Sequence, residues 1–177
     1  MNSKIYNAAT TASNRMGLGS APVEEIVKCV KLHSGLAVAA AWIPVGGLDL
    51  AALTANVWTM YIRINKYLGI SFSENMMKSI GSAVMANLAS NLAMTGCAAA
   101  IKWIPGIGTI AGGALMSAAV YATTVGAAWI YLMAISNWAK GGSSSAASLQ
   151  VCVNDFLANN KHEINEFINS EKANYKA

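Results

Sequence analysis

The side chains that most often carry out chemistry are few in this sequence of 177 residues, and they lie far apart. The two histidines, His33 and His162, have no cysteine or carboxylate at the spacing of a metal site, so we expect each to have a structural or surface role. The sequence offers no Ser-His-Asp, Cys-His or two-carboxylate arrangement. We therefore predict a protein that is not an enzyme and has no metal or cofactor site.

Asp49 is the acidic residue that most needs an explanation. It is the only acid between Glu25 and Glu74, and it lies beside a glycine turn in apolar surroundings. An aspartate there can cap the N-terminus of the following helix. The alternative is a buried ion pair with Arg63 or Lys102, because an ionised group in an apolar environment is normally paired. The sequence leaves both interpretations open.

The composition is unusually apolar for a chain of this length. Apolar residues make up 55% and charged residues 11%, whereas a soluble domain is typically about 25% charged. Residues 103–139 form a stretch of 37 residues without Asp, Glu, Lys, Arg or His. Since about 20 apolar residues suffice to cross a bilayer, this stretch is long enough for one full span. The composition therefore favours association with a membrane.

Charge and cysteine content exclude further classes of protein. The net charge of +4 comes from 12 basic residues without a basic run, so nucleic acid is not an expected partner. Cys29, Cys97 and Cys152 are distant and odd in number, which predicts small packing residues in a reducing compartment. The N-terminus lacks an apolar run long enough for a signal peptide, so secretion is not expected.

The pattern along the chain indicates four segments. Residues 1–19 are rich in Ala, Thr, Ser and Asn and predict a flexible N-terminal tail. Residues 20–140 form the apolar helical module. Residues 141–147 are a Gly/Ser linker, and residues 148–177 predict an amphipathic C-terminal helix and tail.

The apolar module predicts four main helices, over about residues 20–43, 48–68, 74–101 and 105–139. Trp-Ile-Pro stands at the first break and recurs 61 residues later at the third. The predicted fold class is therefore all-α, with two apolar helical hairpins broken at these turns; independent use of the same turn chemistry is the alternative. The predicted turn residues are Pro44, Gly46, Gly47, Pro105, Gly106 and Gly108.

Two further surfaces are predicted for helix packing. Small residues in the fourth helix, including Gly112, Ala122 and Gly126, should allow close approach of a neighbouring helix. The C-terminal helix carries an apolar face for a partner, formed by Leu149, Val153, Phe156, Leu157, Ile164 and Phe167. This face could equally dock on the module. Its acidic neighbours and the lack of a basic face count against a place at the membrane interface.

At several of these residues the chain resembles the GTPase-associated domain of unknown function, a hydrophobic helical domain of YcjF-type bacterial inner-membrane proteins and some Era-like GTPases. The similar segments are Ile43-Pro44 with Asp49, Met60 to Ile64 with Tyr67 and Gly69, Ile104 to Thr109, and Ala122 to Gly126. The resemblance covers roughly residues 35–135. It implies an all-helical, membrane-associated module that works beside a small GTPase or in membrane organisation, without chemistry of its own. The sequence lacks a G-x-x-x-x-G-K-[ST] loop, so that GTPase would be a separate protein.

The first functional hypothesis is a non-enzymatic, membrane-associated or integral module of the cytoplasmic (inner) membrane, with its termini in the cytosol. Its expected partners are the lipid bilayer, a separate GTPase or another protein, and further copies of the chain in a homo-oligomer. The alternative is a soluble helical oligomer that inserts into membranes or forms pores on activation. A scaffold whose C-terminal helix docks a partner is compatible with either hypothesis.

Overall fold

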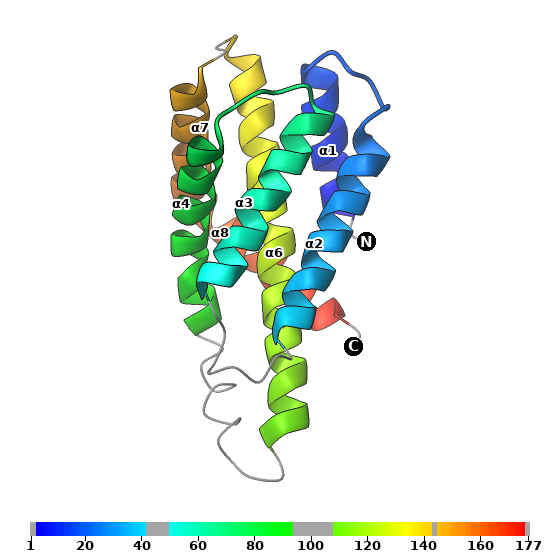
Figure 1. Ribbon diagram of the computed structural model, residues 1–177, viewed down its shortest axis with the longest axis vertical. Coiled ribbons are helices and arrows are strands. Elements are labelled where there is room, and N and C mark those ends of the chain that lie inside the picture. The colour runs from blue at the N-terminus through cyan, green and yellow to red at the C-terminus, as the bar shows by residue number, and fades with distance from the viewer. Residues whose placement is uncertain (1–2, 42–49, 94–107, 143–144, 176–177) are drawn as a thin grey trace.

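The computed structural model describes residues 3–41, 50–93, 108–142 and 145–175. This part of the chain is all-helical and contains no strand (Figure 1). Its helices are α1 (Ser3–Arg15), α2 (Val23–Ala41), α3 (Leu50–Tyr67), α4 (Glu74–Ala93), α6 (Gly108–Lys140), α7 (Ala146–Asn159) and α8 (Lys161–Asn174). The predicted all-α class is therefore confirmed.

The long helix α6 is the centre of the molecule. Figure 1 shows it running along the long axis, with α1 and α2 on one side and α4 and α7 on the other. It contacts every other described helix. No residue from Met116 to Ser136 is exposed. A helix that is apolar all round is stable when other helices cover it, and here six helices supply that cover.

Local signals in the sequence set several helix ends. Glu24 and Glu25 lie in the first turn of α2, where the helix dipole favours negative charge. Gly69 adopts a left-handed φ of 66° after α3, and the N–H of Ile70 returns to the carbonyl of Asn65 at 2.9 Å. The Ser73 side chain then accepts a hydrogen bond from the N–H of Met76 at the start of α4. These contacts agree with the predicted boundary between the second and third helices.

The N-terminal segment is not the flexible tail that its composition predicted, because residues 3–15 form α1. Ile5, Ala8, Ala9 and Ala12 fall on one face of this helix and are buried. The helix lies against α2 and α6. Alanine buries little area, but it lets helices approach closely, so a segment of low hydropathy still packs on the core.

The C-terminal segment is two helices rather than one. The helix α7 ends at Asn159, and Asn160 separates it from α8. The backbone N–H and the side-chain Nδ2 of Asn160 both donate to the carbonyl of Phe156, at 3.1 and 2.9 Å. The apolar spacing continues across this residue, which is why a single helix was predicted. The predicted linker 141–147 is also shorter in the structure, because Ser145 caps α7 and residues 146–147 belong to that helix.

Several predicted residues lie outside the described part of the chain. They are Asp49, Lys102 and the turn residues Pro44, Gly46, Gly47, Pro105 and Gly106. Gly108 is the first residue of α6, and Gly112 lies within that helix. The Trp-Ile-Pro turns and the ion pair through Asp49 therefore stay predictions. The helices on either side of each predicted turn, α2 with α3 and α4 with α6, do contact each other.

Candidate functional site

The charged residues of the four long helices are gathered at one end of the bundle. In α2 they occupy the first three turns, in α4 the first two, and in α3 and α6 the last turns. Because neighbouring helices run in opposite directions, these positions meet at the upper end in Figure 1. The residues are Glu24, Glu25, Lys28, Lys31, Arg63, Lys66, Glu74, Lys78 and Lys140.

The other end of the four helices carries no charge in the described residues. Residues 32–41 of α2, 50–62 of α3 and 79–93 of α4 contain no Asp, Glu, Lys or Arg, and α6 contains none before Lys140. At about 1.5 Å per residue these segments extend for roughly 15 to 22 Å along the helices. We call them, with the N-terminal half of α6, the uncharged end.

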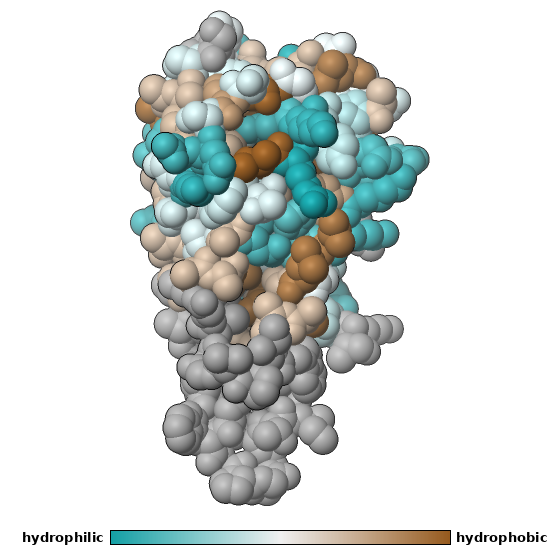
Figure 2. All heavy atoms as spheres, in the orientation of Figure 1, coloured by the Kyte–Doolittle hydropathy of each residue, from teal (hydrophilic) through white to brown (hydrophobic). Residues whose placement is uncertain are grey.

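The outer face of α2 has exposed apolar residues within the uncharged end. Leu32 is 47% exposed and Leu36 is 50% exposed, and Gly35, Ala39 and Ala40 are exposed on the same face. We call these five residues the Leu32–Leu36 face. Lys28 and Lys31 lie one turn before it. Figure 2 shows hydrophilic residues across the middle of the visible surface and paler or brown residues bordering the grey atoms below them.

The opposite side of the bundle is built differently. The apolar face predicted for a partner is buried against α6, with Leu149 and Val153 fully buried. Trp129 of α6 meets Phe156 and Phe167 edge-on, with ring centroids 5.3 and 5.1 Å apart. The six residues therefore pack within this chain, and the outward positions of α8 are mainly polar.

Close packing on this side depends on Gly126. A Cβ atom at this position would lie 2.8 Å from Cγ1 of Ile168, which is closer than two carbon atoms can pack. Ala122, one turn earlier, is also fully buried. Of the small residues predicted for close approach, Gly126 thus lies where α8 rests on α6.

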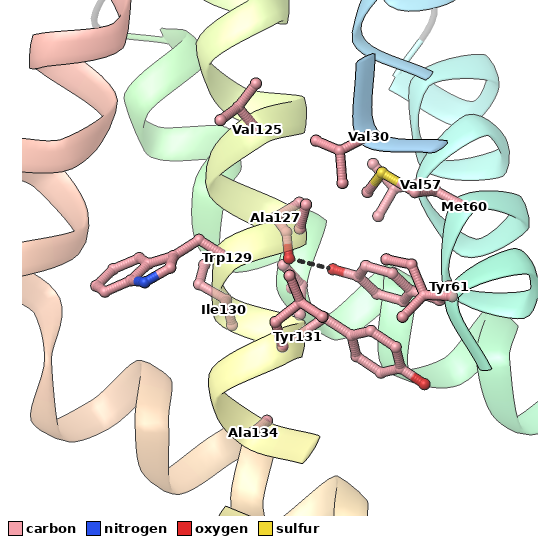
Figure 3. Packing of buried hydrophobic residues seen from close by; sticks show 14 of the residues in the cluster. Val30, Val57, Met60, Tyr61, Val125, Ala127, Trp129, Ile130, Tyr131 and Ala134 are labelled. Atoms are coloured by element: carbon pink, nitrogen blue, oxygen red, sulfur yellow. Dashed lines mark hydrogen bonds between the residues drawn. The ribbon is translucent and has the colours of Figure 1, made fainter. Parts of the chain in front are cut away.

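A buried polar cluster joins α3, α4 and α6. The Tyr61 hydroxyl donates to the carbonyl of Ala127 at 3.0 Å, which Figure 3 marks with a dashed line. The Tyr131 hydroxyl donates to Oδ1 of Asn65 at 2.8 Å. Asn65 Nδ2 in turn points to the sulfur of Met77 at 3.1 Å. These hydrogen bonds satisfy polar groups that would otherwise destabilise the core, and they fix the position of α6.

A second buried polar pair lies between α2 and α3. His33 is 2% exposed, and its Nδ1 lies 2.8 Å from Oδ1 of Asn56. The Asn56 Nδ2 donates to the His33 carbonyl at 2.9 Å. Burial lowers the pKa of His33, the hydrogen bond of its Nδ1 to Oδ1 of Asn56 opposes this, and the positive charge of Arg63 lowers the pKa further. The sequence predicts a structural or surface role for this histidine, and the structure buries it in the middle of α2.

The remaining candidate groups form no reaction centre among the described residues. Arg63 is exposed on α3. No three His, Cys, Asp or Glu side chains gather there at metal-binding distance. The Cys29 thiol is buried, which raises its pKa to about 11 against the opposing charge of Arg63. Within the described chain, Met116–Lys140 is the one helical segment long and apolar enough to cross a membrane, a property shared by core helices of soluble proteins.

Comparison of the chain with protein-family models, with curated proteins and with solved structures finds no match.

Proposed function

We propose that this protein is a non-enzymatic helical module that binds a membrane through its uncharged end and keeps its charged end in the cytosol. The observation that carries this proposal is the segregation of charge along α2, α3, α4 and α6. At a bilayer this segregation lets one end of these four helices enter apolar surroundings without transferring their charged side chains from water.

The Leu32–Leu36 face supplies the first contact in this proposal. Fully burying one leucine side chain is worth about 1.5–3 kcal/mol, so two exposed leucines give a useful but reversible affinity. Lys31, one position before Leu32, is placed to meet lipid phosphates while its alkyl chain lies against the apolar surface. The cytoplasmic membrane, whose inner leaflet carries anionic lipid, is the membrane that we propose.

The second candidate function is a soluble bundle, or an oligomer of it, that inserts α6 into a membrane on activation. It is favoured by the cover of the central and C-terminal part of α6, since no residue from Met116 to Ser136 is exposed. The outward faces of α1 and α8 are mainly polar, as expected for helices in water. In this candidate α1, α7 and α8 must separate from α6 before α6 reaches lipid.

A separate GTPase remains the proposed protein partner, and it rests on the resemblance of the segments around residues 43–69 and 104–126 to the GTPase-associated domain. Affinity purification of the chain from its native cells, with bound nucleotide-binding proteins identified by mass spectrometry, tests this partner. If a GTPase is recovered but detergent alone removes it, the two proteins were held in the same membrane and not in direct contact.

Flotation with lipid vesicles tests the membrane proposal. The wild-type protein should float with vesicles of phosphatidylethanolamine and phosphatidylglycerol, and Leu32→Gln/Leu36→Gln should float at least tenfold less. Val151→Gln is the matched control, because Val151 is 55% exposed but lies on α7. Equal flotation of both variants, or no flotation of the wild type, would refute the proposal.

An alkaline carbonate wash of the membrane pellet separates the two candidates. Release into the supernatant indicates a bundle that contacts the bilayer with its uncharged end. Retention indicates helices inserted across it, as the second candidate requires after activation.

A further inference from the structure

His33 has one satisfied ring nitrogen and one that is buried without a partner. The amide of Asn56 is oriented by its Nδ2, which donates to the His33 carbonyl at 2.9 Å. Oδ1 of Asn56 therefore faces the imidazole, and it can only accept, so Nδ1 of His33 must carry the hydrogen. In the neutral ring Nε2 is then a bare acceptor. It is buried and meets no hydrogen-bond partner among the described residues.

Protonation converts Nε2 of His33 from a hydrogen-bond acceptor into a donor, and it gives the ring a positive charge. A buried donor without an acceptor costs about 1–3 kcal/mol, more when it is charged. The neutral form is therefore compatible with a closed α2–α3 contact, and the protonated form is not.

Among the described residues, the charges around His33 do not offer the proton a counter-ion. From α3 the nearest charge is Arg63, which is positive. The helix α6 carries no charged residue before Lys140, and α1 carries only Lys4, paired with Glu163, and Arg15 at its last residue. Within α2 itself Glu25 is paired with Lys28 at 2.7 Å, two turns before His33, near Glu24 and Lys31.

We propose that His33 is a proton-sensitive latch: while its ring is neutral, it holds α2 against α3, and when Nε2 accepts a proton, this contact loosens and lets the underlying α6 meet lipid beside the Leu32–Leu36 face, which is already exposed. The proposal deepens the proposed function and depends on it only in naming lipid as what the opened bundle meets. His33 directly follows Leu32, so movement at the latch is transmitted to the proposed membrane contact.

The direction of the pH effect follows from the lowered pKa of folded His33. The unfolded chain takes up the proton near pH 6.5, whereas the folded chain does so at a lower pH. Stability is therefore complete above about pH 6.5 and falls with decreasing pH until the folded pKa is reached. For one proton, the unfolding constant rises by at most about tenfold per pH unit in this window.

Urea unfolding between pH 7.5 and 5.0 tests the latch, because the chain contains two histidines and no third can contribute. The His33→Asn variant keeps an amide N–H near the position of Nδ1 and cannot titrate, so it should lose the rise in the unfolding constant. The His162→Asn variant is the matched control, since the His162 side chain is 88% exposed. It should behave as the wild type; the same pH dependence in His33→Asn would overturn the proposal.

A second variant keeps the test decisive if His33→Asn does not fold. Asn56→Asp places a carboxylate against Nδ1, which stabilises the protonated ring, so the loss of stability on acidification should shrink or reverse. An unchanged pH dependence would overturn the latch.

Flotation with phosphatidylethanolamine and phosphatidylglycerol vesicles at pH 7.5 and 5.5 separates the latch from the membrane proposal. Wild-type flotation should increase at pH 5.5, and that of His33→Asn should not. If unfolding depends on His33 but no variant floats at either pH, the latch stands and the membrane function fails. If the wild type floats without any His33-dependent change in unfolding, the latch fails and the membrane function stands.

Discussion

The rings of Tyr61 and Tyr131 stack with centroids 3.9 Å apart and planes inclined by 12°, and this pair joins α3 to the central helix α6. Figure 3 shows both rings on the same side of α6, while Trp129 points away toward the other side. Each hydroxyl has a separate partner, Ala127 for Tyr61 and Asn65 for Tyr131. The stacked pair therefore combines apolar burial with satisfied hydrogen bonds, and it holds the most apolar of the described helices inside the bundle.

The first prediction concerns the Tyr131 hydroxyl. Tyr131→Phe keeps the stacked ring but leaves Oδ1 of Asn65 buried without its donor. We expect the free energy of unfolding in urea to fall by about 1–3 kcal/mol. Tyr67→Phe is the control, because the Tyr67 ring is 37% exposed, and it should change stability little. Equal effects of the two variants would contradict the role given to this hydrogen bond.

The second prediction concerns the contact between α8 and α6. In Gly126→Ala the new methyl group would lie 2.8 Å from Cγ1 of Ile168, so the Ile168 side chain or α8 must shift. We expect a loss of about 1–3 kcal/mol in thermal or urea unfolding. Adding Ile168→Ala should not worsen this loss additively, because the second change removes the atoms that clash. Additive losses would show that the two residues are not in contact.

Gly35→Ala is the matched glycine substitution. A Cβ atom there meets nothing within 4 Å, and Gly35 lies within α2. Alanine should therefore stabilise the protein by up to about 1 kcal/mol through its higher helix propensity. A loss of stability in this variant would indicate a contact on the Leu32–Leu36 face in solution.

The third prediction concerns α1. Lys4 pairs with Glu163 at 2.9 Å, and its Nζ lies 4.5 Å from the centroid of the Trp129 ring. Lys4→Gln should weaken the attachment of α1 by about 1 kcal/mol, seen as faster hydrogen exchange confined to residues 3–15. Lys28→Gln, which breaks an ion pair within α2, should leave that exchange unchanged. Unaltered exchange in Lys4→Gln would mean that α1 is held by its apolar face alone.

The fourth prediction concerns thiol reactivity. Burial raises the pKa of Cys29 to about 11, and burial also raises that of the partly exposed Cys152. Because the thiolate is the reactive form, Cys29 should react with iodoacetamide at pH 8 at least tenfold more slowly than Cys152, as followed by peptide mass spectrometry. Comparable rates would show that the contact of α2 with its neighbours opens readily at this pH.

The main helices could be read from the sequence because their signals are local. Gly69 and Ser73 mark the boundary between α3 and α4 through backbone geometry and capping, which neighbouring residues decide. The helix α1 was missed because its buried face is made largely of alanine, at positions 8, 9 and 12. The helical spacing of these residues indicates α1, but the low hydropathy of the segment makes that pattern weak.

The long-range contacts between helices could not be predicted in the same way. The His33 and Asn56 pair is 23 residues apart in sequence, and the Tyr61 and Ala127 pair is 66 apart. Such pairs depend on how helices rotate and slide against each other in the packed core, which no local pattern specifies. The position of the charged residues near one end of each helix is visible in the sequence. That these ends lie together follows only from the antiparallel order of the helices.

The most direct test of the central claim measures which end of the bundle enters lipid. A single cysteine at position 36 or 151, in a chain whose native cysteines are replaced, is labelled with an environment-sensitive fluorophore and mixed with anionic vesicles containing nitroxide-labelled lipid. Binding through the uncharged end predicts a blue shift and strong quenching at position 36, with little change at position 151. Quenching at position 151 instead, or at neither position when the protein is bound, would contradict the account.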